Sequence, residues 1–280
     1  MSVGALEIGG SHVAGALVDL DTRRLVSAVA LAELNPAGAA DTLLATIAGL
    51  TATVGGNVER RWGVAMPGPF DYHAGVGHFA GVGKFESLAG VDVRAELRAR
   101  VRPTPRALAF VNDADAFALG EWAGGELRGV ARAAALTLGT GIGSCLLADG
   151  RVVSDGPDVP PHGEAHLLRV DGRPLEDLAS ARALRAGYRE PVEVREIAVR
   201  ARAGDGLAAS LLRGYGRAIA TALAPFYRRF GVTRVVFGGA ISASLDLFAD
   251  ELRAAWPGVQ LSVSADPRRA ALLGAALHAG

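Results

Sequence analysis

The feature that most constrains the fold is a glycine hairpin that occurs twice in this chain of 280 residues. Residues 6–26 and residues 136–153 each contain an apolar stretch, a glycine-rich turn, a second apolar stretch and a polar turn. Apolar stretches bounded by glycine and aspartate predict β-hairpins. The copies lie about 130 residues apart, too far for a solenoid repeat, so they indicate a duplicated fold with one hairpin in each half.

The segments around these hairpins alternate between strand and helix patterns. Apolar spacing predicts helices over 39–55, 92–101, 207–230 and from Asp266 onward, and a helix from Pro174 to Gly187. Buried strands are predicted over 61–70 and 233–242, and residues 106–125 read as a strand that passes into a helix. This alternation is typical of α/β architecture in two similar halves.

Composition excludes several classes of protein. Basic and acidic residues number 29 each, so the net charge is zero, which argues against binding to nucleic acid or a membrane surface. Cys145 is the only cysteine, so neither an internal disulfide nor a cysteine-based zinc site can form. No signal peptide or membrane-spanning run is evident, and a cytoplasmic protein is expected.

Four glycine-rich turns follow or join the predicted strands: EIGGSH, AMPGPF, LGTGIGS and FGGAIS. None is a Walker A loop, because glycine-lysine-serine/threonine does not occur. Glycine lets a ligand's phosphates approach backbone N–H groups closely, although a single glycine turn is usually only a turn. Matched turns in duplicated hairpins favour one phosphate-binding hairpin in each half.

Asn112 and Asp113 stand where a buried strand ends and a helix begins. Both residue types are preferred helix N-caps, so a structural role accounts for the pair. A carboxylate at a strand end is also where α/β proteins place their sites, and there Asp113 could accept a proton from a substrate hydroxyl. Asp115 competes for this role, but it falls inside the predicted helix.

Residues 159–180 hold two histidines and several carboxylates within a short polar loop. Such a cluster can be a metal site, an acid/base pair, a substrate cradle or a solvated loop. Pro160, Pro161 and Pro174 restrict the backbone of this loop and are expected to hold its shape.

The order of these motifs resembles the ROK family of sugar kinases. The resemblance rests on EIGGSH, GVAMPGPF, FVNDADAFALGEW, LTLGTGIGS, GEAH…PLEDLAS and VVFGGAIS, and it extends from residue 6 to about residue 277. It implies an actin/hexokinase-like fold with two RNase H-like lobes around a cleft for ATP and sugar. The lobes expected are 1–112 with the closing helix 266–280, and 113–265.

The resemblance also implies roles for individual residues. Asp113 matches the catalytic base. The positions that match sugar-binding residues are Gly68, Asn112, Asp113, Glu164, His166 and Glu176. The positions that match nucleotide-binding residues are Glu7, Gly9, Gly10, Ser11, Gly139, Thr140, Gly141, Gly143, Gly238 and Gly239. Glu7 stands where the family usually has Asp, which helps to hold Mg²⁺. His12, next in the first turn, is expected to face solvent.

The polar loop departs from the family pattern. Many members bind a structural zinc there through one histidine and three cysteines, and all three cysteines are absent. Because structural zinc needs about four ligands, no zinc is expected. The family's Glu-x-x-His is shortened to Glu164-Ala165-His166, which leaves the position of His166 open. The loop is therefore expected to be a sugar cradle. Glu176 has an alternative role, since an acidic residue in a first helical turn stabilises the helix dipole.

The resulting expectation is an ATP- and Mg²⁺-dependent kinase that phosphorylates a hexose such as glucose, or an amino or N-acetyl hexosamine, at the 6-hydroxyl. The rivals are a sugar-binding sensor without catalysis and a ROK-type regulator that lacks a DNA-binding domain. The expected partner is a small-molecule sugar, with no nucleic acid and no membrane. The family is commonly dimeric, which suggests a homodimer.

Overall fold

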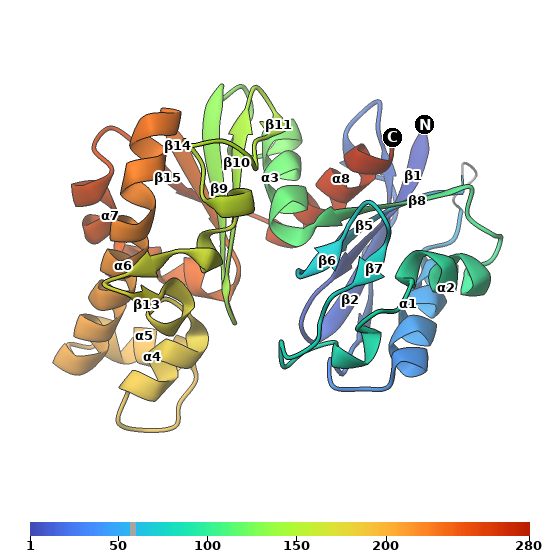
Figure 1. Ribbon diagram of the computed structural model, residues 1–280. Helices are drawn as coiled ribbons and strands as arrows, with labels where there is room; N and C mark the ends of the chain where they lie inside the picture. The colour runs from blue at the N-terminus through green and yellow to red at the C-terminus, as the bar shows by residue number, and fades with distance from the viewer. Residues whose placement is uncertain (57–59) are drawn as a thin grey trace. The chain divides into compact units, whose positions relative to one another are not determined.

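The computed structural model describes residues 1–56 and 60–280 and divides into two compact units (Figure 1). Unit 1 comprises Met1–Gly124 and Asp266–Gly280, and unit 2 comprises Gly125–Ala265. The division drawn from the sequence after residue 112 gave the helix Asp113–Gly124 to the second half, whereas the compact units leave it in the first.

Unit 1 is built on a six-stranded sheet. Its strands are β1 (Ser2–Ile8), β2 (His12–Asp19), β3 (Arg24–Leu25), β4 (Ala30–Glu33), β5 (Arg61–Met66) and β8 (Ala107–Asn112). β1 pairs antiparallel with β2 and parallel with β5, which pairs parallel with β8. The carboxyl ends of β1, β5 and β8 therefore share one edge of the sheet, where α/β folds place their functional residues.

Helices cover both faces of this sheet. They are α1 (Ala40–Val54), α2 (Val93–Arg100), α3 (Asp113–Gly124) and α8 (Pro267–Ala279). Leu6 and Ile8 pack with residues of α1 and α2, whereas Val3 and Ala5 pack with α8, as the two-residue period of a strand requires. A hairpin of β6 (Phe70–Asp71) and β7 (Val76–Gly77) and a 3₁₀ helix, η1 (Glu86–Leu88), complete the unit.

α3 and α8 touch each other through glycine. A Cβ atom on Gly120 would collide with the backbone of Ala270 in α8, and one on Gly274 would collide with the backbone of Ala116 in α3. Each helix thus offers a glycine where the other's backbone comes closest. This reciprocal contact explains why α3 belongs with segment 266–280 in unit 1.

Unit 2 repeats the sheet topology of unit 1. Its strands are β9 (Arg132–Leu138), β10 (Ile142–Ala148), β11 (Arg151–Val152), β14 (Arg234–Gly238) and β15 (Gln260–Val263). β9 pairs antiparallel with β10 and parallel with β14, which pairs parallel with β15. The predicted duplication is confirmed, because an antiparallel hairpin followed by parallel strands builds both sheets.

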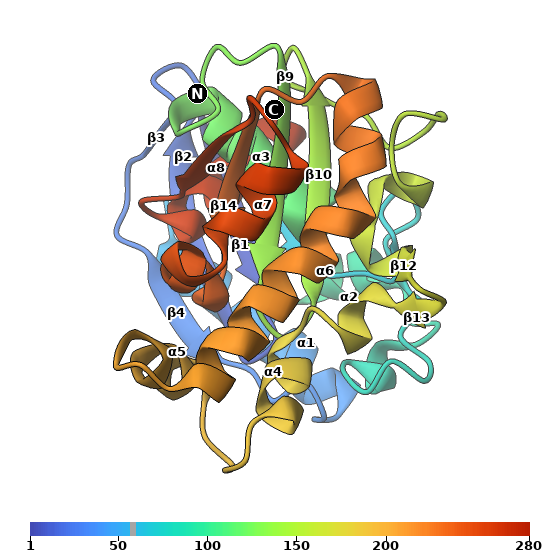
Figure 2. The same ribbon diagram turned by 90° about the vertical axis from the view of Figure 1, so that its left-hand side faces the viewer.

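The helices of unit 2 gather along the sheet, and the long α6 runs in front of it in Figure 2. They are α4 (Ala181–Gly187), α5 (Val194–Arg202), α6 (Gly206–Phe230) and α7 (Ala249–Ala255). Short segments are the strands β12 (Arg169–Val170) and β13 (Arg173–Pro174) and the 3₁₀ helices η2 (Pro161–Gly163), η3 (Ala165–Leu167), η4 (Leu175–Asp177) and η5 (Ala240–Leu247).

The prediction of one helix from Pro174 to Gly187 is wrong. The segment forms η4, a break over residues 178–180, and then α4. Ser180 is in an extended conformation, and its hydroxyl accepts a hydrogen bond from Ala183 N, as an N-cap does. The cap begins a new helix where the sequence suggested that one continued.

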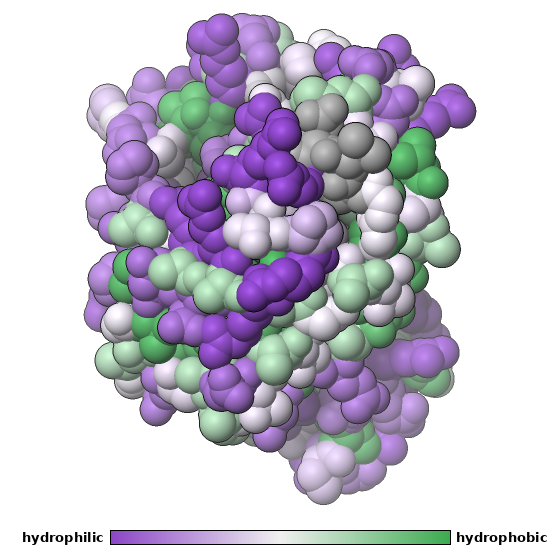
Figure 3. All heavy atoms as spheres, turned by 90° about the vertical axis from the view of Figure 1, so that its right-hand side faces the viewer, coloured by the Kyte–Doolittle hydropathy of each residue, from purple (hydrophilic) through white to green (hydrophobic). Residues whose placement is uncertain are grey.

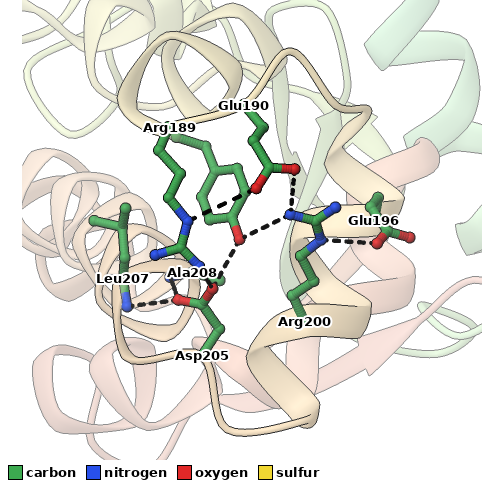
Figure 4. A network of polar contacts seen from close by, with 8 residues as sticks. Arg189, Glu190, Glu196, Arg200, Asp205, Leu207 and Ala208 are labelled. Atoms are coloured by element: carbon green, nitrogen blue, oxygen red, sulfur yellow. Dashed lines mark hydrogen bonds and ion pairs between the residues drawn. The ribbon is translucent and has the colours of Figure 1, made fainter.

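An ionic network joins the ends of α4, α5 and α6 (Figure 4). Asp205 caps α6 by accepting from Leu207 N and Ala208 N, and it also pairs with Arg189. These backbone donors, with Tyr188 and Arg189, lower the pKa of the Asp205 carboxyl. The network fastens three helix ends and has a structural role.

One face of the molecule is shown by residue hydropathy in Figure 3. The face in Figure 3 is mainly hydrophilic, with small apolar patches scattered over it. Among the described helices, none combines the length and hydrophobicity that a membrane crossing requires.

Candidate active site

In unit 1 the first glycine turn lies between β1 and β2. Glu7 is the next-to-last residue of β1, and Gly9 N–H donates to the carbonyl of His12 across the turn (2.8 Å). A Cβ atom on Gly10 would meet nothing within 4 Å, so the backbone there is open. Gly9, Gly10 and Ser11 therefore form a turn whose backbone a phosphate could approach closely.

Glu7 is partly buried at the end of β1, next to this turn. Its carboxyl has a pKa raised from the usual 4.5 to about 7, chiefly because burial disfavours the charged form. Asp113 and Asp266 add to the rise, and Arg268 opposes it. Within the described residues Oε2 of Glu7 is buried without a hydrogen bond. A buried carboxylate oxygen of this kind can serve as a ligand for a cation.

Arg268, at the start of α8, was not anticipated from the sequence. Its Nε lies 3.8 Å from Oε2 of Glu7, and its NH2 group lies 3.4 Å from Nε2 of His12. His12 is thus partly buried against a cation rather than free in solvent, which corrects the expectation for this residue. The pKa of the His12 imidazole is lowered, mainly by burial and then by the charge of Arg268.

Asn112 and Asp113 lie at the shared edge of the sheet. Oδ1 of Asn112 accepts from Ala114 N (2.9 Å) and Asp115 N (3.3 Å), so Asn112 caps α3. Its Nδ2 donates to the hydroxyl of Tyr72 (2.9 Å). Oδ1 of Asp113 accepts from Ala114 N at 2.9 Å. The cap role accounts for the oxygen of Asn112 and leaves a catalytic role for Asp113 open.

Two of the expected sugar-binding positions in unit 1 are neighbours. A Cβ atom on Gly68 would lie 4.0 Å from Nδ2 of Asn112 and 3.5 Å from the hydroxyl of Tyr72. Tyr72 in turn donates to the carbonyl of Met66 at the end of β5. The ends of β5 and β8 therefore bring Gly68, Asn112 and Asp113 to one edge of the sheet. Asp115 also lies near this edge and lines a groove of about 620 Å³ along β8.

In unit 2 the second glycine turn lies between β9 and β10. Gly139 N–H donates to the carbonyl of Gly141 (3.0 Å), and a Cβ atom on Gly139 would meet nothing within 4 Å. Thr140 lies between them, and Gly143 belongs to β10 opposite Thr137. Like the first turn, this one leaves open backbone at its tip.

The carboxylate of Glu176 lies against the second glycine turn. Its Oε1 accepts a hydrogen bond from Ile142 N (3.2 Å), and a Cβ atom on Gly141 would collide with the same oxygen. Glu176 lies in η4, a 3₁₀ helix of three residues, and not in the first turn of a long helix. The stabilisation of a helix dipole that was considered for it therefore does not apply. The carboxylate thus contacts the glycine turn directly.

Gly238 and Gly239 lie next to this turn. Gly238 ends β14 opposite Thr137 of β9, and Gly239 has a φ of 82°. A Cβ atom on Gly239 would collide with the backbone of Leu138. Close packing therefore requires glycine here, and it places Gly238 and Gly239 beside the second glycine turn.

The polar loop is anchored by a serine that was not singled out from the sequence. The buried hydroxyl of Ser144, in β10, donates to the carbonyl of Gly163 and accepts from Ala165 N, each at 2.7 Å. Glu164 lies between these anchor points, and its Oε2 is 3.6 Å from Nε2 of His166. His162 is exposed and has a φ of 55°.

No group of three or more metal-binding side chains occurs among the described residues. The expected absence of a structural zinc remains a prediction. What the structure shows is a hydroxyl that ties the loop to β10 on either side of Glu164.

Comparison with known proteins identifies the family. A model of the ROK family matches residues 3–263. This chain belongs to the ROK family. A glucokinase of Thermotoga maritima is 30% identical over 218 residues, which is 68% of this chain and 67% of that protein.

Two solved structures of kinases share the fold. A ROK hexokinase from Thermus thermophilus is 27% identical with a TM-score of 0.81, and the match covers 100% of this chain and 98% of that one. An inorganic polyphosphate/ATP-glucomannokinase from Arthrobacter sp. strain KM is 26% identical with a TM-score of 0.73, over 99% and 97% of the two chains. The fold is therefore the actin/hexokinase-like fold expected.

Proposed function

We propose that this chain is a sugar kinase that transfers the γ-phosphoryl group of ATP to the 6-hydroxyl of a hexose or hexosamine, with Asp113 as the general base. The observation that carries the proposal is the meeting of Glu7, the open turn at Gly10 and Asp113 at one sheet edge of unit 1. It is supported by the glucokinase and hexokinase relatives, which are named for this kind of chemistry.

Phosphoryl transfer depends on positioning and charge neutralisation more than on covalent catalysis. Backbone N–H groups at the two glycine turns suit phosphate oxygens, and Asp113 suits the task of orienting the attacking hydroxyl and accepting its proton. The residues fit Mg²⁺, because Glu7 presents a buried carboxylate oxygen without a hydrogen bond in the described part of the chain. When bound, Mg²⁺ would neutralise charge on the phosphates.

The sugar-binding roles remain proposals for both units. In unit 1 we assign them to Gly68, Asn112 and Asp113, and in unit 2 to Glu164, His166 and Glu176. Glu176 is assigned a second task, because its Oε1 already accepts from Ile142 N. We likewise propose nucleotide-binding roles for the two glycine turns and for Gly238 and Gly239. A cytoplasmic location and a homodimer are proposed as well.

The first test is an assay of donor consumption over a panel of hexoses and hexosamines. ATP and inorganic polyphosphate should be compared as phosphoryl donors, because the name of the similar Arthrobacter glucomannokinase includes both. We expect turnover with ATP and a sugar phosphorylated at the 6-position, identified by NMR. Sugar binding without any turnover would indicate a sensor instead of a kinase.

The second test replaces the proposed base. Asp113→Asn should lower kcat by about 10² to 10⁴, the usual contribution of a general base, while calorimetry shows that the sugar still binds. Asp250→Asn makes the same chemical change at an exposed position of α7 and should leave kcat unchanged. An Asp113→Asn variant with normal turnover would exclude the assigned role.

A further inference from the structure

Glu7 needs a partner because of where it lies. Its side chain is 21% exposed, and both Asp113 and Asp266 add negative charge around it. A carboxylate that has lost most of its water is stable only near a compensating cation. Among the groups that act on its charge, Arg268 is the cation.

Glu7 also has more freedom than a shorter carboxylate would have. Its carboxyl is separated from the backbone by one more rotatable bond than that of aspartate, so the strand alone fixes its direction less well. Within the described residues, no hydrogen bond to Oε2 supplies the missing constraint. A charged group on a rigid support can supply it instead.

Arg268 stands on such a support. It lies in the first turn of α8, whose N-cap Asp266 accepts a hydrogen bond from Arg269 N and whose first residue is Pro267. The helix is locked against α3 by the close contact at Gly120 and Gly274. The base of the arginine side chain is therefore fixed relative to the sheet edge.

The guanidinium joins the two strands that flank the first glycine turn. It faces Glu7 on β1 through Nε and His12 on β2 through NH2. Nε of Arg268 lies 3.8 Å from Oε2 of Glu7, and both atoms are buried without a hydrogen bond in the part of the chain that the structure describes. The two opposite charges are thus close enough to attract each other, but Nε and Oε2 are too far apart for a direct hydrogen bond.

We propose that Arg268 is a positioning residue that holds the carboxylate of Glu7 in the direction from which it binds Mg²⁺ together with the nucleotide. The inference rests on the proposed kinase function. It assigns Arg268 an action through Glu7 and not a direct contact with the phosphates, so its effect must depend on the length of the side chain at position 7.

The experiment is a double-mutant cycle on binding, measured by calorimetry with the non-hydrolysable Mg²⁺·AMPPNP. Arg268→Gln should weaken its binding about tenfold when position 7 is Glu. In the Glu7→Asp background the same substitution should cost less than about twofold, because the shorter side chain needs no anchor. Arg268→Lys, which keeps the charge, should restore part of the affinity.

The matched control is Arg269→Gln, which removes the same charge from an exposed neighbour on the same helix and should leave binding unchanged. Equal losses in the parent and in the Glu7→Asp background would overturn the proposal, because Arg268 would then act independently of Glu7. An unchanged affinity of Arg268→Gln would overturn it too. If the unaltered protein does not bind Mg²⁺·AMPPNP at all, the proposed kinase function fails instead. Thermal unfolding of each variant separates a binding loss from a folding defect.

Discussion

The two glycine turns have the same topology and differ in the side chains that lie beside them. Beside the turn of unit 1 lie Glu7 and Arg268, whose facing atoms lack hydrogen bonds in the described part of the chain, and Leu34 N donates to the carbonyl of Ser11 in the turn itself. The turn of unit 2 rests on hydrogen bonds, from Ile142 N to Glu176 and from Ala181 N to Gly139. The hairpin backbone is therefore repeated in both units, while Glu7 beside the first turn keeps a carboxylate oxygen that a bound cation could contact.

The charge of Glu7 should make the stability of unit 1 depend on pH. The folded chain holds a proton on Glu7 up to about pH 7, whereas the unfolded chain releases it near 4.5. Stability should therefore fall as pH rises through this window, and the cost above pH 7 is about 3 kcal/mol.

Glu7→Gln checks this cost. The variant should be more stable than the parent at pH 8 and similar to it at pH 4.5, as measured by urea unfolding at both values. Glu33→Gln removes a carboxylate at an exposed position of β4 and should show no such difference. Equal stability of Glu7→Gln and the parent at pH 8 would mean that the carboxylate is already compensated.

The loop that follows the second hairpin should lose about 2 kcal/mol of stability in Ser144→Ala. The substitution leaves the carbonyl of Gly163 and the N–H of Ala165 without their buried partner. Urea unfolding measures the loss, and Ser210→Ala, exposed in α6, should show none. If Ser144→Ala left the free energy of unfolding unchanged, Ser144 would not anchor the loop, and the three prolines would be the better explanation of its shape.

The smallest effects on stability are expected at the two open turn tips. Gly10→Ala and Gly139→Ala should each change the free energy of unfolding by less than about 0.5 kcal/mol, because the added methyl group meets no atom. Both should still weaken Mg²⁺·AMPPNP binding if phosphates approach the backbone there. Gly120→Ala provides the contrast, since its methyl group collides with α8 and should destabilise unit 1 by about 3 kcal/mol. Binding that survives at one turn only would show that the two copies have diverged in function.

The sequence was informative wherever the signal is local. Glycine between apolar stretches predicted both hairpins, and Asn112-Asp113 marked the junction of β8 and α3, because strand periodicity and cap chemistry act over a few residues. The helix predicted from Pro174 failed because Ser180 can equally well sit within a helix or cap one.

The parts of the site that were missed depend on contacts far apart in the chain. Arg268 meets Glu7 and His12 across more than 250 residues, and no local pattern distinguishes it from its neighbour Arg269. Ser144 reads as an ordinary strand residue, and only the folded loop gives its hydroxyl two partners. The prolines named for that task are restrictive by themselves, but the direct ties to β10 come from serine.

The return of α8 to unit 1 bears on how the chain is made. Residues 266–280 leave the ribosome after the whole of unit 2, yet Leu272, Leu273 and Ala276 form part of the core behind β1 and β2. During synthesis, unit 2 can therefore complete its core before unit 1 does, although unit 1 begins first. Until α8 arrives, the part of the first sheet's alanine-lined face that this helix covers stays exposed, and only α3 packs there.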